Sequence, residues 1–184
     1  DDPGELEEAL LQACENADAV VTSGGVSVGV ADYTKQVMAK MGDVAFWSIR
    51  MRPGRPMAFG KIRSGGDHAF LFGLPGNPVA VMVSFYFFVR DALLHMMGAL
   101  PSPLLPVRAQ AATSLSKRMG RMEFQRGVLS QNADGNLTVR TTGEQGSGIL
   151  RSMTEANGII VLPEECETVR AGEWVDVIQL EGLT

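Results

Sequence analysis

The chain has 184 residues, of which 16 are Lys or Arg and 21 are Asp or Glu, so its formal net charge is −5. Proteins that bind nucleic acid gain much of their affinity from a surplus of basic residues, and the balance found in this chain excludes a general polyanion binder. With 45% hydrophobic and 20% charged residues, the composition is typical of a globular protein with a buried core.

The sequence predicts neither secretion, nor a zinc site, nor a membrane span. Residues 1–5 lack the basic and apolar segments of a signal peptide, so we expect a cytoplasmic protein. Cys14 and Cys166 lie far apart and only two histidines are present, which leaves no zinc-ligand spacing. The most apolar stretch, residues 78–89, is shorter than the roughly 20 residues that span a bilayer, and we expect it to form a buried helix.

Helices and strands alternate in the first part of the chain. Asp2 is a favourable N-cap and Pro3 suits the first helical position, so a helix is predicted to begin at this point. A short buried strand follows over 19–22, then a glycine-rich loop, and then a second helix that Asp32 can cap. This order of elements is typical of α/β proteins.

A strand with two different faces is predicted over 45–52. Apolar residues recur at every second position and end with Ile49 and Met51, whereas Arg50 and Arg52 share the other face. We therefore expect two arginine side chains to project from one side of a single strand.

Proline and glycine punctuate the next segment. Pro53-Gly54-Arg55-Pro56 interrupts the strand, and two more strands are predicted over 57–62 and 68–74. Asn77 can then cap, and Pro78 can open, a long apolar helix.

Beyond residue 101 the pattern changes to short apolar runs separated by turn residues. These runs predict an all-β barrel or sandwich. We place a domain boundary near residue 101, which gives an α/β domain over 1–100 and a β domain over 101–184. The predicted strands lie over 107–115, 122–130, 137–142, 158–162 and 174–180.

The charges are distributed unevenly. Residues 1–34 contain eight acidic and no basic side chains, whereas residues 44–66 contain five basic and no acidic ones. Such runs are often solvated faces, but arginine forks on a fixed strand suit phosphate or another oxyanion. Arg50 and Arg52 are therefore candidate anion ligands.

The loop over 23–29 is a candidate backbone site for an anion. Its glycines would let the main chain approach a ligand, although it has neither Walker nor dinucleotide-binding spacing. Taken alone, the loop is equally consistent with a plain connection. Asp32 can be a helix cap or a metal or acid–base residue.

A second strand-to-helix turn lies over 73–78. It can be a well-made turn and nothing more, or its helix start can hold an anion. In an open α/β sheet both turns would lie at the carboxyl ends of strands, where ligands bind.

Together these motifs resemble the molybdopterin molybdenumtransferase family, which includes bacterial MoeA and the gephyrin E domain. The likeness rests on residues 22–29, Asp32-Tyr33, residues 51–56 and residues 73–78. It continues through Arg121, Glu123-Phe124, Arg126-Gly127, Gln145-Gly146-Ser147 and Asn157-Gly158. The resemblance implies a three-layer, MogA-like α/β molybdopterin-binding domain that lacks its N-terminal part, followed by a small β-barrel domain.

The resemblance also implies a function. Members of this family are transferases of molybdenum cofactor biosynthesis that insert molybdate into adenylylated molybdopterin with Mg²⁺ and release AMP. A homodimer is implied for the full-length protein, without nucleic-acid or membrane partners. The chain itself is expected to be a C-terminal fragment that turns over poorly alone.

The implied site residues fall into two groups. Asp32 and Asp1 match acidic residues of the family's active site, with Asp32 as the metal ligand. Substrate binding is assigned to Ser23, Gly24, Gly25, Ser27, Gly29, Arg50, Arg52, Pro53, Gly54, Arg55, Pro75, Gly76 and Asn77.

The sequence departs from the family's pattern at two positions. Relatives often have a basic residue at Ser48, and we hypothesise that Arg50, on the same predicted face, replaces that charge. Relatives also often have a serine at Ala80, so one hydroxyl contact is expected to be missing. Two other functions stay open: a pterin binder similar to molybdopterin adenylyltransferases, and a non-catalytic scaffold or binding module.

Overall fold

The structure is a computed structural model that describes residues 2–26, 32–100, 103–143, 145–146 and 151–180, with only the backbone of Asp32 and Tyr33. The chain divides into two compact units. One, the α/β unit, comprises Asp1–Ile49 and Gly54–Leu100, and the other, the barrel unit, comprises Arg50–Pro53 and Pro101–Thr184. Residues 50–53 thus group with the barrel, although they lie in sequence between two strands of the α/β unit.

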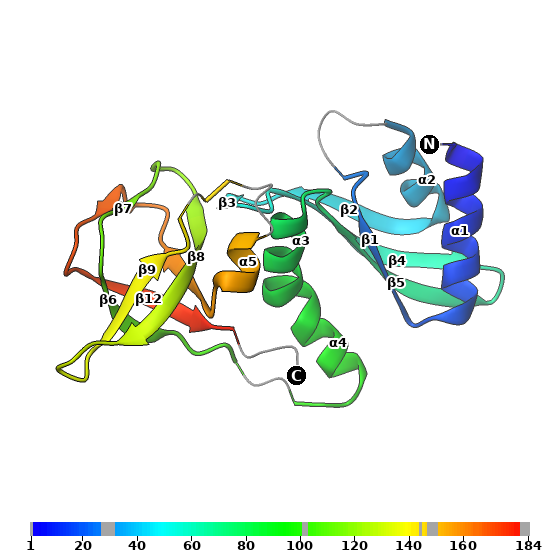
Figure 1. The fold of residues 1–184 in the computed structure, drawn as a ribbon. Coiled ribbons are helices and arrows are strands. Elements are labelled where there is room, and N and C mark those ends of the chain that lie inside the picture. Colours follow the sequence, from blue (N-terminus) through cyan, green and yellow to red (C-terminus); the bar gives the residue numbers. More distant parts are fainter. Residues whose placement is uncertain (1, 27–31, 101–102, 144, 147–150, 181–184) are drawn as a thin grey trace. The chain divides into compact units, whose positions relative to one another are not determined.

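The α/β unit is built on a four-stranded sheet of order β1-β5-β4-β2 (Figure 1). Strand β1 pairs with β5 in parallel, while β4 runs antiparallel to both β5 and β2. The strands of this sheet are β1 (Ala19–Ser23), β2 (Gly42–Ser48), β4 (Pro56–Ser64) and β5 (Asp67–Leu74). Its helical segments are α1 (Pro3–Asn16), α2 (Asp32–Met41), α3 (Pro78–Ser84), the π-helical η1 (Phe85–Val89) and α4 (Arg90–Met96).

Helices cover both faces of this sheet. Leu10 and Cys14 of α1 and Met38 of α2 are buried in one core cluster with Ile62 and Leu71 of the sheet. A second cluster contains other residues of the same strands together with residues of α3, η1 and α4: Met57, Phe72, Leu74 and Val89 form its buried centre. The predicted three-layer α/β architecture is therefore confirmed.

The N-cap proposed at Asp2 forms as expected. The Asp2 side chain accepts a hydrogen bond from the Gly4 N–H at 2.7 Å, and Pro3 is the first residue of α1. This arrangement satisfies an amide that would otherwise lack a partner at the helix start.

Helix α3 continues through η1 into α4, so that Pro78–Met96 forms one helical segment of 19 residues. By length and composition alone this segment could cross a bilayer, a test that core helices of soluble proteins also pass. Val79, Val83 and Val89 are buried within the α/β unit. Only 28% of its most apolar window is buried, and α4 contains no buried residue, so the expected buried helix is found only in part.

The prediction of a strand over 45–52 was wrong about where the strand ends and about which of its side chains are buried. Strand β2 ends at Ser48. Val44 and Phe46 pack against the cluster of α1 and α2, whereas Trp47, expected on the buried face, is 59% exposed. Both faces of this strand carry apolar residues, so a period of two could not tell which face packs against which helical layer.

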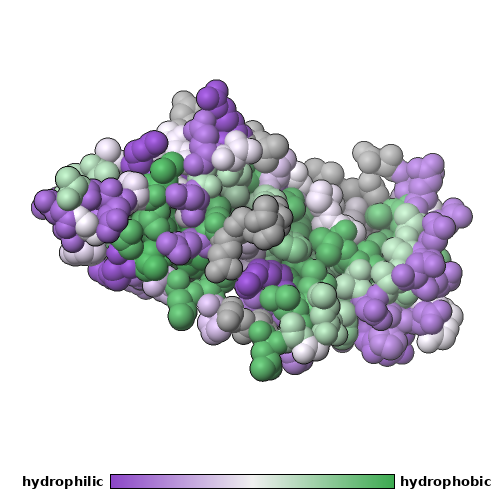
Figure 2. Space-filling model, turned by 60° about the horizontal axis from the view of Figure 1, so that its bottom comes forward, coloured by the Kyte–Doolittle hydropathy of each residue, from purple (hydrophilic) through white to green (hydrophobic). Residues whose placement is uncertain are grey.

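Apolar side chains also reach the surface of the α/β unit. The rings of Phe59 and Phe70 stack with centroids 6.3 Å apart, and both are partly exposed. Green areas in Figure 2 mark such side chains on one face of the molecule. Seven residues line an apolar cavity of about 330 Å³ in this unit: Trp47, Ile49, Met57, Phe59, Phe72, Phe88 and Ala92.

The barrel unit closes a ring of five strands, because β10 pairs with both β12 and β8 in the order β10-β12-β6-β9-β8. The ring strands are β6 (Val107–Ala111), β8 (Met122–Gln131), β9 (Leu137–Thr141), β10 (Gly158–Leu162) and β12 (Trp174–Gln179). Two short strands, β7 (Leu115–Ser116) and β11 (Thr168–Val169), pair with each other. Closure removes the exposed edges that an open sheet of this size would have, and the predicted β-barrel is confirmed.

A further short strand, β3 (Met51–Arg52), extends this unit. It pairs in parallel with β8, with Met51 opposite Met122 and Arg52 opposite Glu123. The side chain of Met51 is only 3% exposed. Met51 and Arg52 therefore belong to the barrel unit by their strand pairing.

Candidate functional site

One end of the α/β sheet gathers most of the residues singled out from the sequence. Strand β1 ends at Ser23 opposite Leu74, the last residue of β5. Because β4 is antiparallel to β5, its first residue, Pro56, lies at this same end, and Ser48 at the end of β2 pairs with Pro56. The glycine loop, the turn after β5 and Arg55 thus share one end of the sheet.

The two glycine-containing turns at this end are in contact. The Gly24 N–H donates to the Leu74 carbonyl at 3.0 Å, and a Cβ on Gly76 would lie 3.4 Å from the Gly24 Cα. Gly24 and Gly25 have φ values of 93° and 74°, a region that side chains rarely adopt. Glycine is therefore required in this loop by its backbone conformation.

The hydrogen bonds show which amides remain available at this end. The Gly24 N–H is used to hold the loop on β5. Within the described part of the chain, the N–H groups of Gly25 and Gly76 donate to no acceptor. These two amides are the candidate donors for an anion, whereas Gly24 has a structural role.

Asn77 caps α3 as predicted. Its Oδ1 accepts hydrogen bonds from the N–H groups of Val79 and Ala80, at 3.1 and 3.3 Å, and the Val81 N–H donates to the Asn77 carbonyl. Because these bonds use the first amides of the helix, the helix start itself is not an anion seat. Of the two alternatives left open for this turn, the hydrogen bonds favour the plain helix cap, and the unused amide of Gly76 precedes the helix.

Arg55 is held at the same end by a neutral partner. Its Nε donates to the Ser48 Oγ at 2.9 Å. On the backbone, the Ile49 N–H donates to the Arg55 carbonyl at 2.8 Å. Buried Gly54, with φ of 101°, and buried Pro75 flank this region as elements of its backbone.

Arg50 and Arg52 do not project from the α/β sheet, contrary to expectation. Both lie in the barrel unit with Pro53, where Arg50 Nη1 is 3.2 Å from Glu164 Oε1. The side chain that contacts Ser48 is that of Arg55, so the hypothesis that Arg50 replaces a basic residue at position 48 is not supported. A period-two pattern cannot indicate with which sheet the end of an apolar stretch pairs.

The barrel unit has a cationic cavity of its own. Its volume is about 430 Å³, and Arg52, Arg118, Met119, Arg121 and Glu123 line it. Three guanidinium groups around one cavity, with a single carboxylate, favour an anion. The sequence analysis did not single out Arg118, although Lys117, Arg118 and Arg121 lie within five consecutive residues, and this local cluster of basic residues was the signal that could have found it.

Among the described residues of the barrel unit, Arg126 is the most buried charged one, with 1% of its surface exposed. It donates through Nε to the Ser152 Oγ at 2.9 Å and through its Nη atoms to the carbonyls of Gln145 and Gly146. Burial lowers the pKa of the Arg126 guanidinium, Glu123 opposes this shift, and Arg52 adds to it. Arg126 thus holds the segment around 145–146 to strand β8.

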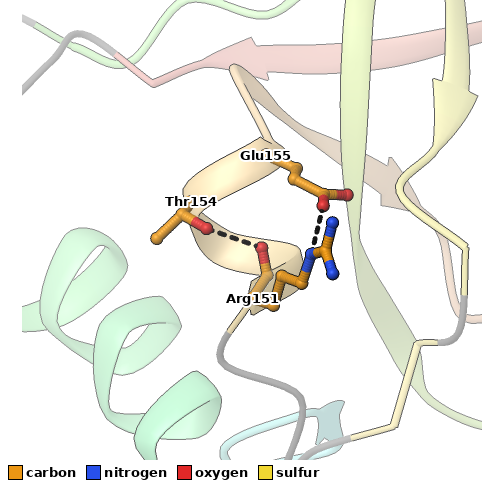
Figure 3. A network of polar contacts seen from close by, with 3 residues as sticks. All are labelled: Arg151, Thr154 and Glu155. Atoms are coloured by element: carbon orange, nitrogen blue, oxygen red, sulfur yellow. Dashed lines mark hydrogen bonds and ion pairs between the residues drawn. The ribbon is translucent and has the colours of Figure 1, made fainter.

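Ser152 belongs to the short helix α5 (Arg151–Glu155). The exposed residues of this helix make local contacts with one another (Figure 3). Arg151 Nε donates to Glu155 Oε1 at 2.7 Å, and the Thr154 hydroxyl donates to the Arg151 carbonyl at 2.8 Å. These exposed contacts are worth little individually. The connection between Ser152 and Arg126 ties the helix to the barrel.

Several predicted site residues fall outside the described part of the chain. These are Asp1, Ser27, Gly29 and the side chain of Asp32, of which the structure gives only the place at the first residue of α2. Among the described residues no group of three or more His, Cys, Asp or Glu side chains could hold a metal ion. The described residues therefore provide anion donors but no metal site.

Comparisons with known proteins agree with this division. Residues 1–95 match a family model described as a probable molybdopterin binding domain, and residues 108–180 match the MoeA C-terminal region (domain IV). The chain is 42% identical to a molybdopterin molybdenumtransferase of Haemophilus influenzae, with 96% of this chain and 43% of the relative covered. It is 31% identical to gephyrin of Dictyostelium discoideum over 94% of this chain and 27% of that protein.

Solved structures give the same result. The MoeA protein of Pyrococcus horikosii superposes with a TM-score of 0.78 at 28% identity, covering 99% of this chain and 42% of that one. The chain thus spans less than half the length of the curated relatives named above. By its sequence, its two units and these likenesses, the chain belongs to the molybdopterin-binding domain family and, within it, to the MoeA and gephyrin group.

Proposed function

We propose that this chain acts in molybdenum cofactor biosynthesis, as part of a molybdopterin molybdenumtransferase that inserts molybdate into adenylylated molybdopterin and releases AMP. The names of the relatives and the match over residues 1–95 support this proposal. Because the chain spans about 43% of the Haemophilus relative, the activity and the substrates are proposed for it on the basis of these likenesses.

The contact between the two glycine turns is the observation that carries the proposal. It brings the unused amides of Gly25 and Gly76 to the sheet end where Arg55 lies. A pterin phosphate, an adenylate and molybdate are all oxyanions, and fixed N–H dipoles together with a guanidinium stabilise such charge. Ser23, exposed at the end of β1, adds a hydroxyl to this set.

The cavity of the barrel unit that Arg52, Arg118 and Arg121 line supports the proposal that this unit also binds an anion. Arginine binds phosphate and similar oxyanions through two parallel hydrogen bonds. We assign to these side chains the binding of a negatively charged group of the substrates, and to Arg126 a structural role, since it holds residues 145–146 and Ser152 to β8.

Magnesium remains a prediction from the family resemblance, with Asp32 as the proposed ligand and Asp1 as a second catalytic carboxylate. The described residues do not fit a metal ion by themselves.

Calorimetric titration of the chain with AMP and with molybdate, each with and without MgCl₂, tests the proposal. We expect saturable binding of both, with the Mg²⁺-dependent part lost in Asp32→Ala and kept in Arg63→Gln, an exposed arginine at the other end of β4. Incubation with adenylylated molybdopterin should then release AMP only when molybdate is present.

Other outcomes would favour the other functions. Consumption of ATP together with molybdopterin would indicate an adenylyltransferase. Failure to bind AMP or molybdate would contradict the enzyme and favour a scaffold. The proposed homodimer is tested by light scattering at several protein concentrations, and the cytoplasmic location by fractionation of cells.

A further inference from the structure

The contact between Ser48 and Arg55 is fixed by the backbone on both sides. Ser48 lies opposite Pro56 in the ladder between β2 and β4. The Ile49 N–H donates to the Arg55 carbonyl at 2.8 Å. Because these bonds set the positions of both residues, the 2.9 Å hydrogen bond from Arg55 Nε to Ser48 Oγ restricts a side chain whose backbone is already held.

This contact leaves most of the guanidinium available. Arginine has five N–H donors, and Ser48 uses the one on Nε. Within the described part of the chain, Arg55 has no other hydrogen bond and no ion pair. The four N–H groups on Nη1 and Nη2 therefore remain for a ligand.

The chemical nature of the partner matters as well. Arg50 is paired with the carboxylate of Glu164, which offsets its charge. The partner of Arg55 is a hydroxyl, which orients the guanidinium without neutralising it. An arginine oriented in this way keeps its full charge for an incoming anion.

Arg55 lies at the same end of the sheet as the two glycine turns. It directly precedes β4, which neighbours β5, and β5 ends at Leu74 beside the contact of Gly24 with Gly76. Neighbouring strands lie about 4.8 Å apart. One anion can therefore meet the amides of the turns and the Nη atoms of Arg55.

We propose that Ser48 is a positioning residue of the oxyanion site: its hydroxyl directs the Arg55 guanidinium so that the Nη donors face the anion held at the glycine turns. This inference rests on the proposed function, since it takes this sheet end as the binding site. It assigns to Ser48 a role in which the neutral side chain is an advantage, because a hydroxyl accepts a hydrogen bond that a lysine cannot accept.

Titration with molybdate and with AMP at low salt tests the proposal, because salt screens exposed charges. Each titration is followed by the NMR signal of the Arg55 Nε–H and by calorimetry. The variants are Ser48→Ala, which removes the acceptor, Ser48→Thr, which keeps a hydroxyl, and Arg55→Lys, which lacks Nε. Arg63→Lys, at the other end of β4, the strand that Arg55 precedes, is the matched control for Arg55→Lys.

We expect Ser48→Ala to weaken binding of the anion about fivefold, or about 1 kcal/mol at 1.4 kcal/mol per tenfold. Ser48→Thr should restore affinity, and Ser48→Ala should have no further effect in the Arg55→Lys background. The thermal midpoint should stay at that of wild type, because both side chains are exposed.

Two results would overturn the inference. Wild-type affinity in Ser48→Ala, or an equal loss in the wild-type and Arg55→Lys backgrounds, would show that Ser48 does not act through Arg55, while anion binding itself would stand. Absence of saturable binding in wild type would instead reject the proposed function, and the role of Ser48 with it.

Discussion

At the scale of single residues, Gly25 combines two separate constraints. Its φ of 74° disfavours a side chain, and a Cβ would lie 2.7 Å from the Thr34 Cγ2. Gly65, with φ of 56°, has open space around its Cβ position. A side chain at Gly65 would therefore be disfavoured by the backbone conformation but would meet no steric clash.

We therefore expect Gly25→Ala to lower the free energy of unfolding by about 2–3 kcal/mol, and Gly65→Ala by about 1 kcal/mol. Urea denaturation measures both. Equal losses in the two variants would show that the contact with Thr34 relaxes at no cost.

Arg126 provides a second prediction at this scale. Its replacement by Ala would remove the hydrogen bonds that its guanidinium donates to the carbonyls of Gln145 and Gly146 and to the Ser152 hydroxyl. We expect a loss of about 2–4 kcal/mol in the free energy of unfolding. Arg140→Ala, at an exposed position of β9, is the control and should change stability by less than about 0.5 kcal/mol. A small effect of Arg126→Ala would contradict the proposed structural role.

At the scale of elements, substitutions at Asn77, the N-cap of α3, should affect stability and anion binding differently. Asp is as good an N-cap as Asn, so Asn77→Asp should keep the stability of wild type, whereas Asn77→Ala should lose about 1 kcal/mol. The added negative charge of Asn77→Asp should weaken molybdate binding at the neighbouring turn. Thermal unfolding and calorimetric titration of the two variants test this pair of results. Unchanged molybdate affinity in Asn77→Asp would place the anion elsewhere.

At the scale of the whole molecule, the pairing of β3 with β8 makes a specific prediction. Met51 is buried and groups with the barrel unit, although it follows β2 of the α/β unit in sequence. Met51→Ala should cost about 2–4 kcal/mol through the cavity it leaves. Hydrogen exchange should then accelerate at the amides of β8 and β10 and not at those of β4 and β5. The reverse pattern would assign residues 50–53 to the α/β unit.

The sequence predicted the order of elements in both units because caps, glycine stops and period-two runs are local signals. Asp2, Asn77 and Pro78 each mark a helix start that the structure confirms. The resemblance also led to the correct family. What local signals could not supply was the partner of the segment 50–53, since Met51 pairs with Met122, far away in sequence.

The candidate site was predicted only in part for the same reason. Its glycine turns followed from composition and from their place after strands. Arg50 and Arg52 were predicted in a strand of the α/β sheet, whereas Arg50 lies in a bend and Arg52 in β3 of the barrel unit. The partnership of Ser48 with Arg55 depends on strand register, which a single sequence does not fix. Arg126 appeared only through the resemblance, because a buried arginine in a strand looks like an ordinary polar position.

The central claim is that one end of the α/β sheet binds an oxyanion through the two glycine turns and Arg55. An NMR titration of the ¹⁵N-labelled chain with molybdate tests it most directly. The account predicts saturable shifts at the amides of Gly25 and Gly76 and at the Arg55 Nε–H, with the signals of Gly65 and Gly135 unchanged. Saturable shifts confined to other residues, or no saturable shift at all, would contradict it.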